Sequence, residues 1–232
     1  MEKEALEKIL DNNKQISKLL KENEELLRKE GYDPPANNFV LSPHERIVFP
    51  TGYIRTVPRF IEKYHLREIF PKRYSRHNVT YALEVSDLIN YVFNRIHIYG
   101  AVETVFYKLA IVNLVSIMEA IILEAANNIC PNAKVCKNTK LCYKHFSRNE
   151  RNNVRLALNK LVLIEILDFD EEKLERIQYI VELRNRIHIR LSLDGEVQSD
   201  NYNLQLYNET ISFLQEIDQQ IYEKGVPLYG CN

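Results

Sequence analysis

The sequence predicts an all-α protein, a helical bundle preceded by an amphipathic helical arm at the N-terminus. Only 6 of the 232 residues are glycine, which is few for a turn-rich β protein. Leu, Ile, Glu, Lys and Asn are abundant, and apolar residues recur at helical spacing over long segments. The 31 basic and 32 acidic residues nearly cancel. The chain is therefore neither disordered nor a protein that coats nucleic acid by bulk charge.

The first helix is expected over residues 3–29, where apolar side chains fall on the spacing of a coiled-coil seam. These side chains are Leu6, Ile9, Ile16, Leu20 and Leu27. Gly31 ends the helix, and the Pro34-Pro35 pair prevents its continuation. The arm could pair with a second copy of itself or pack on its own body. With the proline-rich segment that follows, it forms the first of two expected parts, residues 1–57.

The second part, residues 58–232, is expected to be the helical bundle. Ser147 and Glu150 form a capping box that begins one of its helices, and Asp170 is the N-cap of the next. The segment 102–129 is apolar nearly all round, so it should be the central helix against which the others pack. The expected helices span 59–70, 79–97, 102–129, 148–167, 171–189 and 203–223.

The most apolar stretch, residues 109–126, raises the question of a membrane span. Asn113, Ser116 and Glu119 interrupt it, and a carboxylate is expensive at the centre of a bilayer. A buried core helix explains the stretch better. The N-terminus is charged and no short apolar segment follows it, so no signal peptide is predicted. We therefore expect a cytoplasmic protein without a membrane partner.

An arginine and a histidine share the apolar face of the helix expected over 171–189. Arg184 and His188 are four residues apart, which places their side chains next to each other among Ile180, Leu183 and Ile187. A guanidinium is rarely buried alone because its desolvation must be offset. Arg184 must therefore meet an acid, an opposing subunit or a solvated pocket. One alternative is structural: Arg184 bonds to a core acid such as Glu119, with a satisfied histidine beside it.

The word Asn-Arg-Ile-His-Ile occurs twice, at residues 94–98 and 185–189. In the first copy Phe93 stands where the second has Arg184, so no arginine precedes His97 by four residues. His97 also lies beyond the edge of the apolar arc of its helix. The repetition is therefore interpreted as a coincidence, and only the second copy combines the two side chains.

The segment Leu183-Arg184-Asn185-Arg186-Ile187-His188, late in an all-helical chain, resembles the signature of the HEPN superfamily (higher eukaryotes and prokaryotes nucleotide-binding). The interval between Arg184 and His188 is shorter than is usual in that family. The resemblance implies a HEPN-like bundle acting as a metal-independent endoribonuclease, without a cofactor, in which Arg184, Asn185 and His188 are the catalytic residues. It further implies a homodimer, a role as a toxin or antiphage effector, and an antitoxin or sensor protein as partner.

These residue types suit RNA cleavage, because RNA carries its own nucleophile in the 2′-hydroxyl. A histidine that titrates near neutral pH can take or supply the proton. An arginine can hold the phosphate through two parallel bonds and stabilise the charge of the transition state. A two-fold dimer would supply a second histidine. The rival hypothesis is a non-catalytic HEPN-like module that binds a partner or a nucleotide.

Basic side chains recur at helical spacing at the start of the helix expected over 148–167. They could follow an RNA backbone, or they could form a solvated helix face. The residues are Lys144, Arg148, Arg151 and Arg155.

Three cysteines and a histidine stand in the segment before that helix, at spacings that differ from paired zinc knuckles. A structural zinc and free thiols both remain open, and we favour free thiols, with no metal in the reaction. The residues are Cys130, Cys136, Cys142 and His145.

Overall fold

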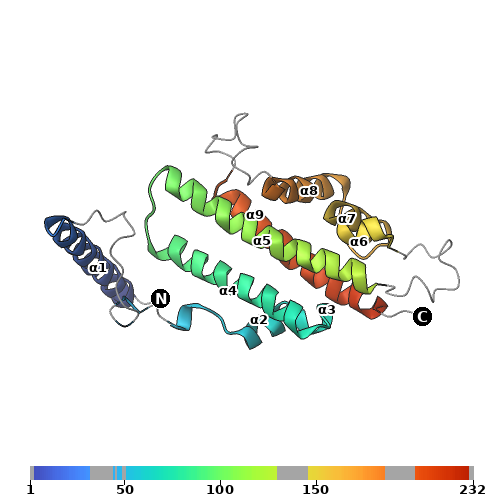
Figure 1. The fold of residues 1–232 in the computed structure, drawn as a ribbon, viewed down its shortest axis with the longest axis horizontal. Coiled ribbons are helices and arrows are strands. Elements are labelled where there is room, and N and C mark those ends of the chain that lie inside the picture. The colour runs from blue at the N-terminus through green and yellow to red at the C-terminus, as the bar shows by residue number, and fades with distance from the viewer. Residues whose placement is uncertain are drawn as a thin grey trace. The chain divides into compact units, whose positions relative to one another are not determined.

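The computed structural model describes residues 3–31, 44, 46–48, 51–129, 146–185 and 202–229. The chain divides into two compact units, Met1–Pro50 and Thr51–Asn232. Helices dominate both units, and no strand occurs in the described ranges (Figure 1). A single antiparallel bridge between Ile129 and Tyr229 is the only extended pairing described there. The prediction of an all-α fold is confirmed.

The first unit contains α1, Lys3–Lys29, which has the bounds expected from the sequence. Gly31 adopts a left-handed φ of +83° after the last turn, where a residue with a Cβ would be strained. The apolar side chains of α1 are all at least partly exposed, and none is buried. The helix therefore presents an open apolar stripe within its own unit.

The second unit is built around α5, Ala101–Asn128. Figure 1 shows α4 (Arg73–Arg95) on one side of α5, and α7 (Val154–Leu163) with α8 (Glu171–Asn185) on the other. The helix α9 (Leu204–Gln220) also packs along α5. Buried side chains cover more than half of the circumference of α5, and they are densest in its second half, as expected for the central helix. They include Ile111, Val115, Met118, Ile122 and Ala126.

The helix α5 is also the one described helix that is long and apolar enough to cross a membrane. More than half of its most apolar window, 56%, is buried inside the bundle. Neighbouring helices cover this part of the surface, as they do for the core helix of a bundle.

Two helices expected to be continuous are each broken once. The expected helix 59–70 is split into α2 (Val57–Lys63) and α3 (Leu66–Ile69), because His65 adopts a left-handed backbone with φ 43°. The expected helix 148–167 is split into α6 (Arg148–Asn152) and α7. Asn153 is extended there, and its side chain accepts a bond from the Leu156 amide, so it caps α7 instead of continuing α6.

The remaining helix ends agree more closely with the sequence. The capping box at Ser147 is present, with Ser147 N–H donating to Glu150 at 2.6 Å. Asp170 accepts from the Lys173 amide at 2.8 Å at the start of α8. The expected extension of α8 to residue 189 lies outside the described residues. After α9 the chain continues as a π-helix, Ile221–Gly225 (η2), and a 3-10 turn, Val226–Leu228 (η3). The short 3-10 turn Thr51–Tyr53 (η1) precedes α2 and contacts α4.

Candidate functional site

Arg184 lies on the last turn of α8, beside the residues that anchor this helix to the core. Ile180, Val181 and Leu183 are buried. The Arg184 side chain reaches from this apolar face to α5, where its Nη1 donates to Glu119 Oε2. Glu119 is the core acid expected as the structural alternative. Of the three kinds of partner left open by the burial argument, the structure shows the core acid, which is the contact expected if Arg184 is structural.

The two members of this ion pair differ in exposure. The Glu119 side chain is 12% exposed, whereas that of Arg184 is 40% exposed. Burial raises the pKa of Glu119, and the charge and hydrogen bond of Arg184 lower it by less. The guanidinium therefore only partly offsets the cost of burying the carboxylate. The pair holds a half-exposed cation in place at the end of α8.

The acid of this ion pair borders a hollow of about 300 Å³ between α5, α6, α7 and α8. Glu119 lines this hollow together with polar side chains of the surrounding helices, among them Asn152, Asn153, Gln178 and Glu182. Arg155 lies at its edge and donates to Glu182 at 3.2 Å. Glu119 therefore lies at a cleft that is large enough for a small group, whereas Arg184 is not one of the described residues that line it.

The other two predicted catalytic residues are less fully described. Asn185 is the last residue of α8. His188 lies outside the described residues. The prediction that the Arg184 and His188 side chains lie next to each other therefore stays a prediction. The structure thus places the arginine of the predicted motif and identifies its acidic partner.

The predicted basic stripe is not continuous. Arg148 and Arg151 belong to α6, but the break at Asn153 puts Arg155 on α7, out of helical register with them. Arg155 is also paired with Glu182. The expectation of one stripe was wrong because the Asn153 side chain caps a new helix. Lys144 lies outside the described residues, as do Cys130, Cys136, Cys142 and His145.

A histidine–aspartate pair was not anticipated from the sequence. His65 Nδ1 lies 3.1 Å from Asp218 Oδ2, and the ring stacks on Tyr222 with centroids 3.8 Å apart. Asp218 is buried, which raises its pKa to about 6 against the opposing effect of His65. A positive φ is uncommon for any residue with a Cβ, although histidine tolerates it better than most, and these long-range contacts help to hold the left-handed backbone at His65. Neither the left-handed backbone of His65 nor its distant partner Asp218 can be recognised from the neighbouring residues in the sequence.

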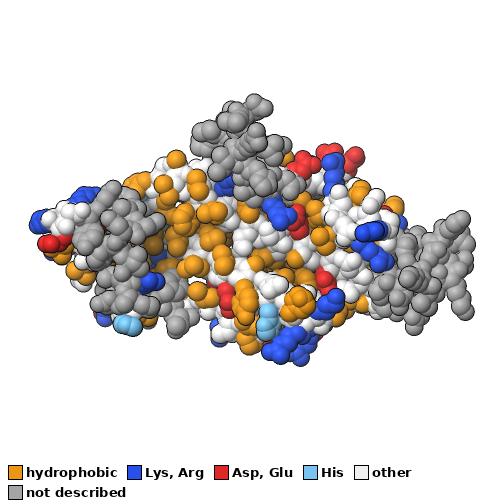
Figure 2. Space-filling view, in the orientation of Figure 1, with side chains coloured by type: hydrophobic (Ala, Val, Ile, Leu, Met, Phe, Trp, Pro, Cys, Tyr) orange, Lys and Arg blue, Asp and Glu red, His pale blue; other side chains and the backbone are white. Residues whose placement is uncertain are grey.

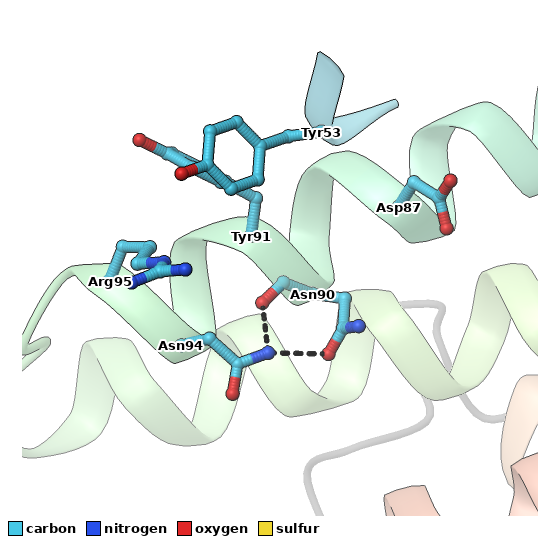
Figure 3. A pocket seen from close by; sticks show the side chains of 6 residues that line it. All are labelled: Tyr53, Asp87, Asn90, Tyr91, Asn94 and Arg95. Atoms are coloured by element: carbon cyan, nitrogen blue, oxygen red, sulfur yellow. Dashed lines mark hydrogen bonds between the residues drawn. The ribbon is translucent and has the colours of Figure 1, made fainter. Parts of the chain in front are cut away.

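The first copy of the repeated pentapeptide also has an unexpected setting. Asn94 and Arg95 line a hollow of about 400 Å³ on α4. Figure 3 shows the crossed rings of Tyr53 and Tyr91 above the Asn90 and Asn94 amides, with Arg95 beside them. Asn94 and Arg95 also line a second hollow of about 310 Å³, which includes His97. The sequence signal was the helical spacing of Asn90 with Asn94 and of Tyr91 with Arg95.

Comparison of the chain with protein-family models, with curated proteins and with solved structures found no match.

Proposed function

We propose that this protein is a metal-independent endoribonuclease of the HEPN type, with its catalytic residues at the end of α8. The observation that carries the proposal is the half-exposed guanidinium of Arg184, held in place by the largely buried carboxylate of Glu119, which itself lines a cleft. A guanidinium has five N–H donors, and Nη1 alone bonds to Glu119 among the described residues. The remaining donors suit a phosphate group.

In the proposed reaction, the 2′-hydroxyl oxygen of the substrate attacks the adjacent phosphorus. The bond from phosphorus to the 5′-oxygen breaks, and a 2′,3′-cyclic phosphate forms. His188 acts on the proton, as base toward the 2′-hydroxyl or as acid toward the 5′-oxygen. Arg184 stabilises the charge that builds on the phosphate oxygens, and Asn185 orients the phosphate or the histidine. Because Glu119 already holds Arg184 in place, less reorganisation of the guanidinium is needed during the step.

We further propose that the protein acts as a homodimer, so that a second histidine completes the acid and base pair. An exposed apolar surface supports association with a second copy. Figure 2 shows hydrophobic side chains gathered over the first half of α5 and the adjoining half of α4. Those with large exposed areas are Val85, Leu88, Val102, Val105 and Leu109. The resemblance adds a cytoplasmic toxin or antiphage role, with an antitoxin or sensor as partner.

The test is cleavage of RNA by the purified full chain with a chelator present. We expect wild-type protein to cut RNA and to leave DNA of the same sequence intact. His188→Ala should reduce cleavage by about 10²-fold or more. His77→Ala, on α4, is the matched control and should cut like wild type. Equal cutting of DNA, or undiminished cutting by His188→Ala, would contradict the mechanism.

A second candidate is a non-catalytic helical module that binds a protein partner or a nucleotide. The same ion pair favours it, because an arginine neutralised by a core acid is also what a purely structural contact requires. Absence of RNA cleavage at any protein concentration, from a dimeric and folded sample, would select this second candidate.

A further inference from the structure

Two adjoining hollows on the last turns of α4 form a surface that the proposed cleavage site does not use. The first is lined by Tyr53, Asp87, Asn90, Tyr91, Asn94 and Arg95. The second is lined by residues 93–98 with Glu103 and Tyr107 of α5. Asn94 and Arg95 belong to both, so a single cation stands between two cavities of about 400 and 310 Å³. Each has the size of a small-molecule pocket.

The first hollow combines aromatic rings with amides. Tyr53 is 46% exposed, and its ring meets that of Tyr91 edge-on with centroids 4.7 Å apart. The Arg95 guanidinium lies over the Tyr53 ring, 5.5 Å from its centroid. This contact holds the cation beside the ring. Figure 3 shows the two rings and Arg95 at one end of the hollow, with the amides below. An exposed tyrosine ring backed by a second ring is a surface on which a base stacks.

The amides supply a polar edge. Asn94 Nδ2 donates to the backbone oxygen of Asn90 at 2.8 Å and to Asn90 Oδ1 at 3.0 Å. This arrangement leaves Asn94 Oδ1 as an acceptor and the Asn90 amide group as a donor. A neighbouring donor and acceptor match the edge of a nucleobase. The one acid in this hollow, Asp87, is already bonded through both oxygens to Arg55 at 2.5 to 3.2 Å.

The second hollow has an apolar floor and polar sides. Phe93 stacks on Tyr107 with centroids 4.3 Å apart, and His97 and Glu103 stand among the lining residues. The Glu103 carboxylate repels a phosphate but can accept a bond from the amino group of a base. The C-terminal end of α4 also disfavours an anion. A phosphate at this place therefore depends on Arg95.

We propose that these hollows bind two successive unpaired nucleotides, one base in each, with Arg95 on the phosphate that joins them. In a single strand a phosphate lies between each pair of neighbouring bases, and the shared position of Arg95 reproduces that order. The surface thus holds the strand on α4 while the end of α8 carries out cleavage. This inference rests on the proposed function only in taking RNA as the strand.

The experiment measures binding without cleavage, using fluorescence anisotropy of a short labelled 2′-O-methyl RNA that lacks the nucleophilic hydroxyl. The other ligands are DNA of the same sequence and adenosine monophosphate. The mononucleotide shows whether the hollows bind a free nucleotide as well as they bind a strand. We expect Arg95→Ala to weaken strand binding about tenfold and to reduce the salt slope by about 0.7. Tyr53→Ala should also weaken it about tenfold, and Tyr53→Phe should bind like wild type.

Arg73→Ala is the matched control, because it removes one exposed arginine from the other end of the same helix, about 33 Å away. It should leave binding unchanged. Equal binding by wild type and Arg95→Ala would overturn the inference, as would tight binding of the mononucleotide with no gain for the strand. Cleavage by wild type with no effect of Arg95→Ala on binding would refute the pocket alone. Binding through Arg95 without cleavage would refute the nuclease alone.

Discussion

Two arginine–carboxylate pairs occupy similar depths in this molecule but are bonded differently. Arg55 and Asp87 are 35% and 7% exposed, and Arg184 and Glu119 are 40% and 12% exposed. Arg55 donates its backbone N–H to Asp87 at 2.8 Å, and its Nε and Nη2 also bond to the carboxylate. Its guanidinium lies 4.6 Å from the Phe60 ring centroid. Arg184 bonds to Glu119 through Nη1 alone among the described residues.

The difference separates a structural clamp from a site that can take a ligand. In the Arg55–Asp87 pair the backbone N–H, Nε and Nη2 of the arginine bond to both oxygens of the acid, so the contact joins the segment before α2 to α4. In the Arg184–Glu119 pair the acid fixes the arginine but leaves most of its donors for another anion. Burial alone does not distinguish them, because their exposures are nearly equal.

The largest effect on stability should come from the clamp. Asp87→Asn keeps the shape of the side chain but leaves a half-buried Arg55 without a counter-charge. We expect the free energy of unfolding to fall by about 3 kcal/mol and the melting temperature by about 6–12 °C. Thermal unfolding followed by circular dichroism measures this. Asp168→Asn, at an exposed acid, is the control, and equal melting of the two variants would show that the pair is no clamp.

Asp218 is a third buried acid, and its contribution to the free energy of unfolding should depend on pH. Burial raises the folded-state pKa of Asp218 to about 6, above the value of about 4 in an unfolded chain. The neutral carboxyl is therefore favoured by folding, and its stabilising contribution is complete below pH about 4 and lost as the pH rises through about 6. Urea unfolding from pH 4 to 8 should show this decline, at most about 3 kcal/mol, in wild type and not in Asp218→Asn. If the free energy of unfolding changes with pH in the same way in wild type and in Asp218→Asn, Asp218 is not the cause of the decline.

The smallest stability effect should come from the Arg184–Glu119 pair. In Glu119→Gln the relief of desolvation and the loss of attraction to Arg184 nearly offset each other. We expect the free energy of unfolding to change by no more than about 1 kcal/mol. RNA cleavage should fall about tenfold, because the neutral amide of glutamine attracts the Arg184 guanidinium less than the carboxylate does and fixes it less firmly. Glu209→Gln, in the exposed pair with Arg176, is the control and should cleave normally. If Glu119→Gln unfolds, or if it cleaves RNA like wild type, the proposed difference between the Arg184–Glu119 pair and the Arg55–Asp87 pair is wrong.

The fold was predictable where local rules decide it. The bounds of α1 followed from apolar spacing and a terminal glycine, and α5 was identified as the core helix by its uniform apolar character. The breaks at His65 and Asn153 were not predicted. The first is accompanied by a contact with Asp218, far along the chain, which helps to hold the left-handed backbone at His65. The second depends on a side-chain cap that competes with helix continuation.

The candidate site shows the same division. Helix-wheel placement and the cost of burial showed that Arg184 required a partner, and Glu119 was one example of the possible core acids; the choice among an acid, a second subunit and a solvated pocket needed the structure. The hollows around Arg95 were missed because Tyr53, on a separate turn before α2, supplies a wall that no periodicity on α4 reveals. The first pentapeptide, residues 94–98, was also interpreted as a coincidental repeat, because no arginine stands four residues before His97. Its Asn94 and Arg95 were therefore not considered as binding residues.

The most direct measurement is single-turnover RNA cleavage by Arg184→Lys beside wild type and Arg55→Lys. Lysine at 184 keeps a positive charge for Glu119, so the fold should survive, but it cannot make two parallel bonds to a phosphate. We expect Arg184→Lys to melt within about 2 °C of wild type and to lose cleavage by about 10²-fold. Arg55→Lys should lose stability instead. Undiminished cleavage by Arg184→Lys, with its melting temperature lowered like that of Arg55→Lys, would show that Arg184 is structural.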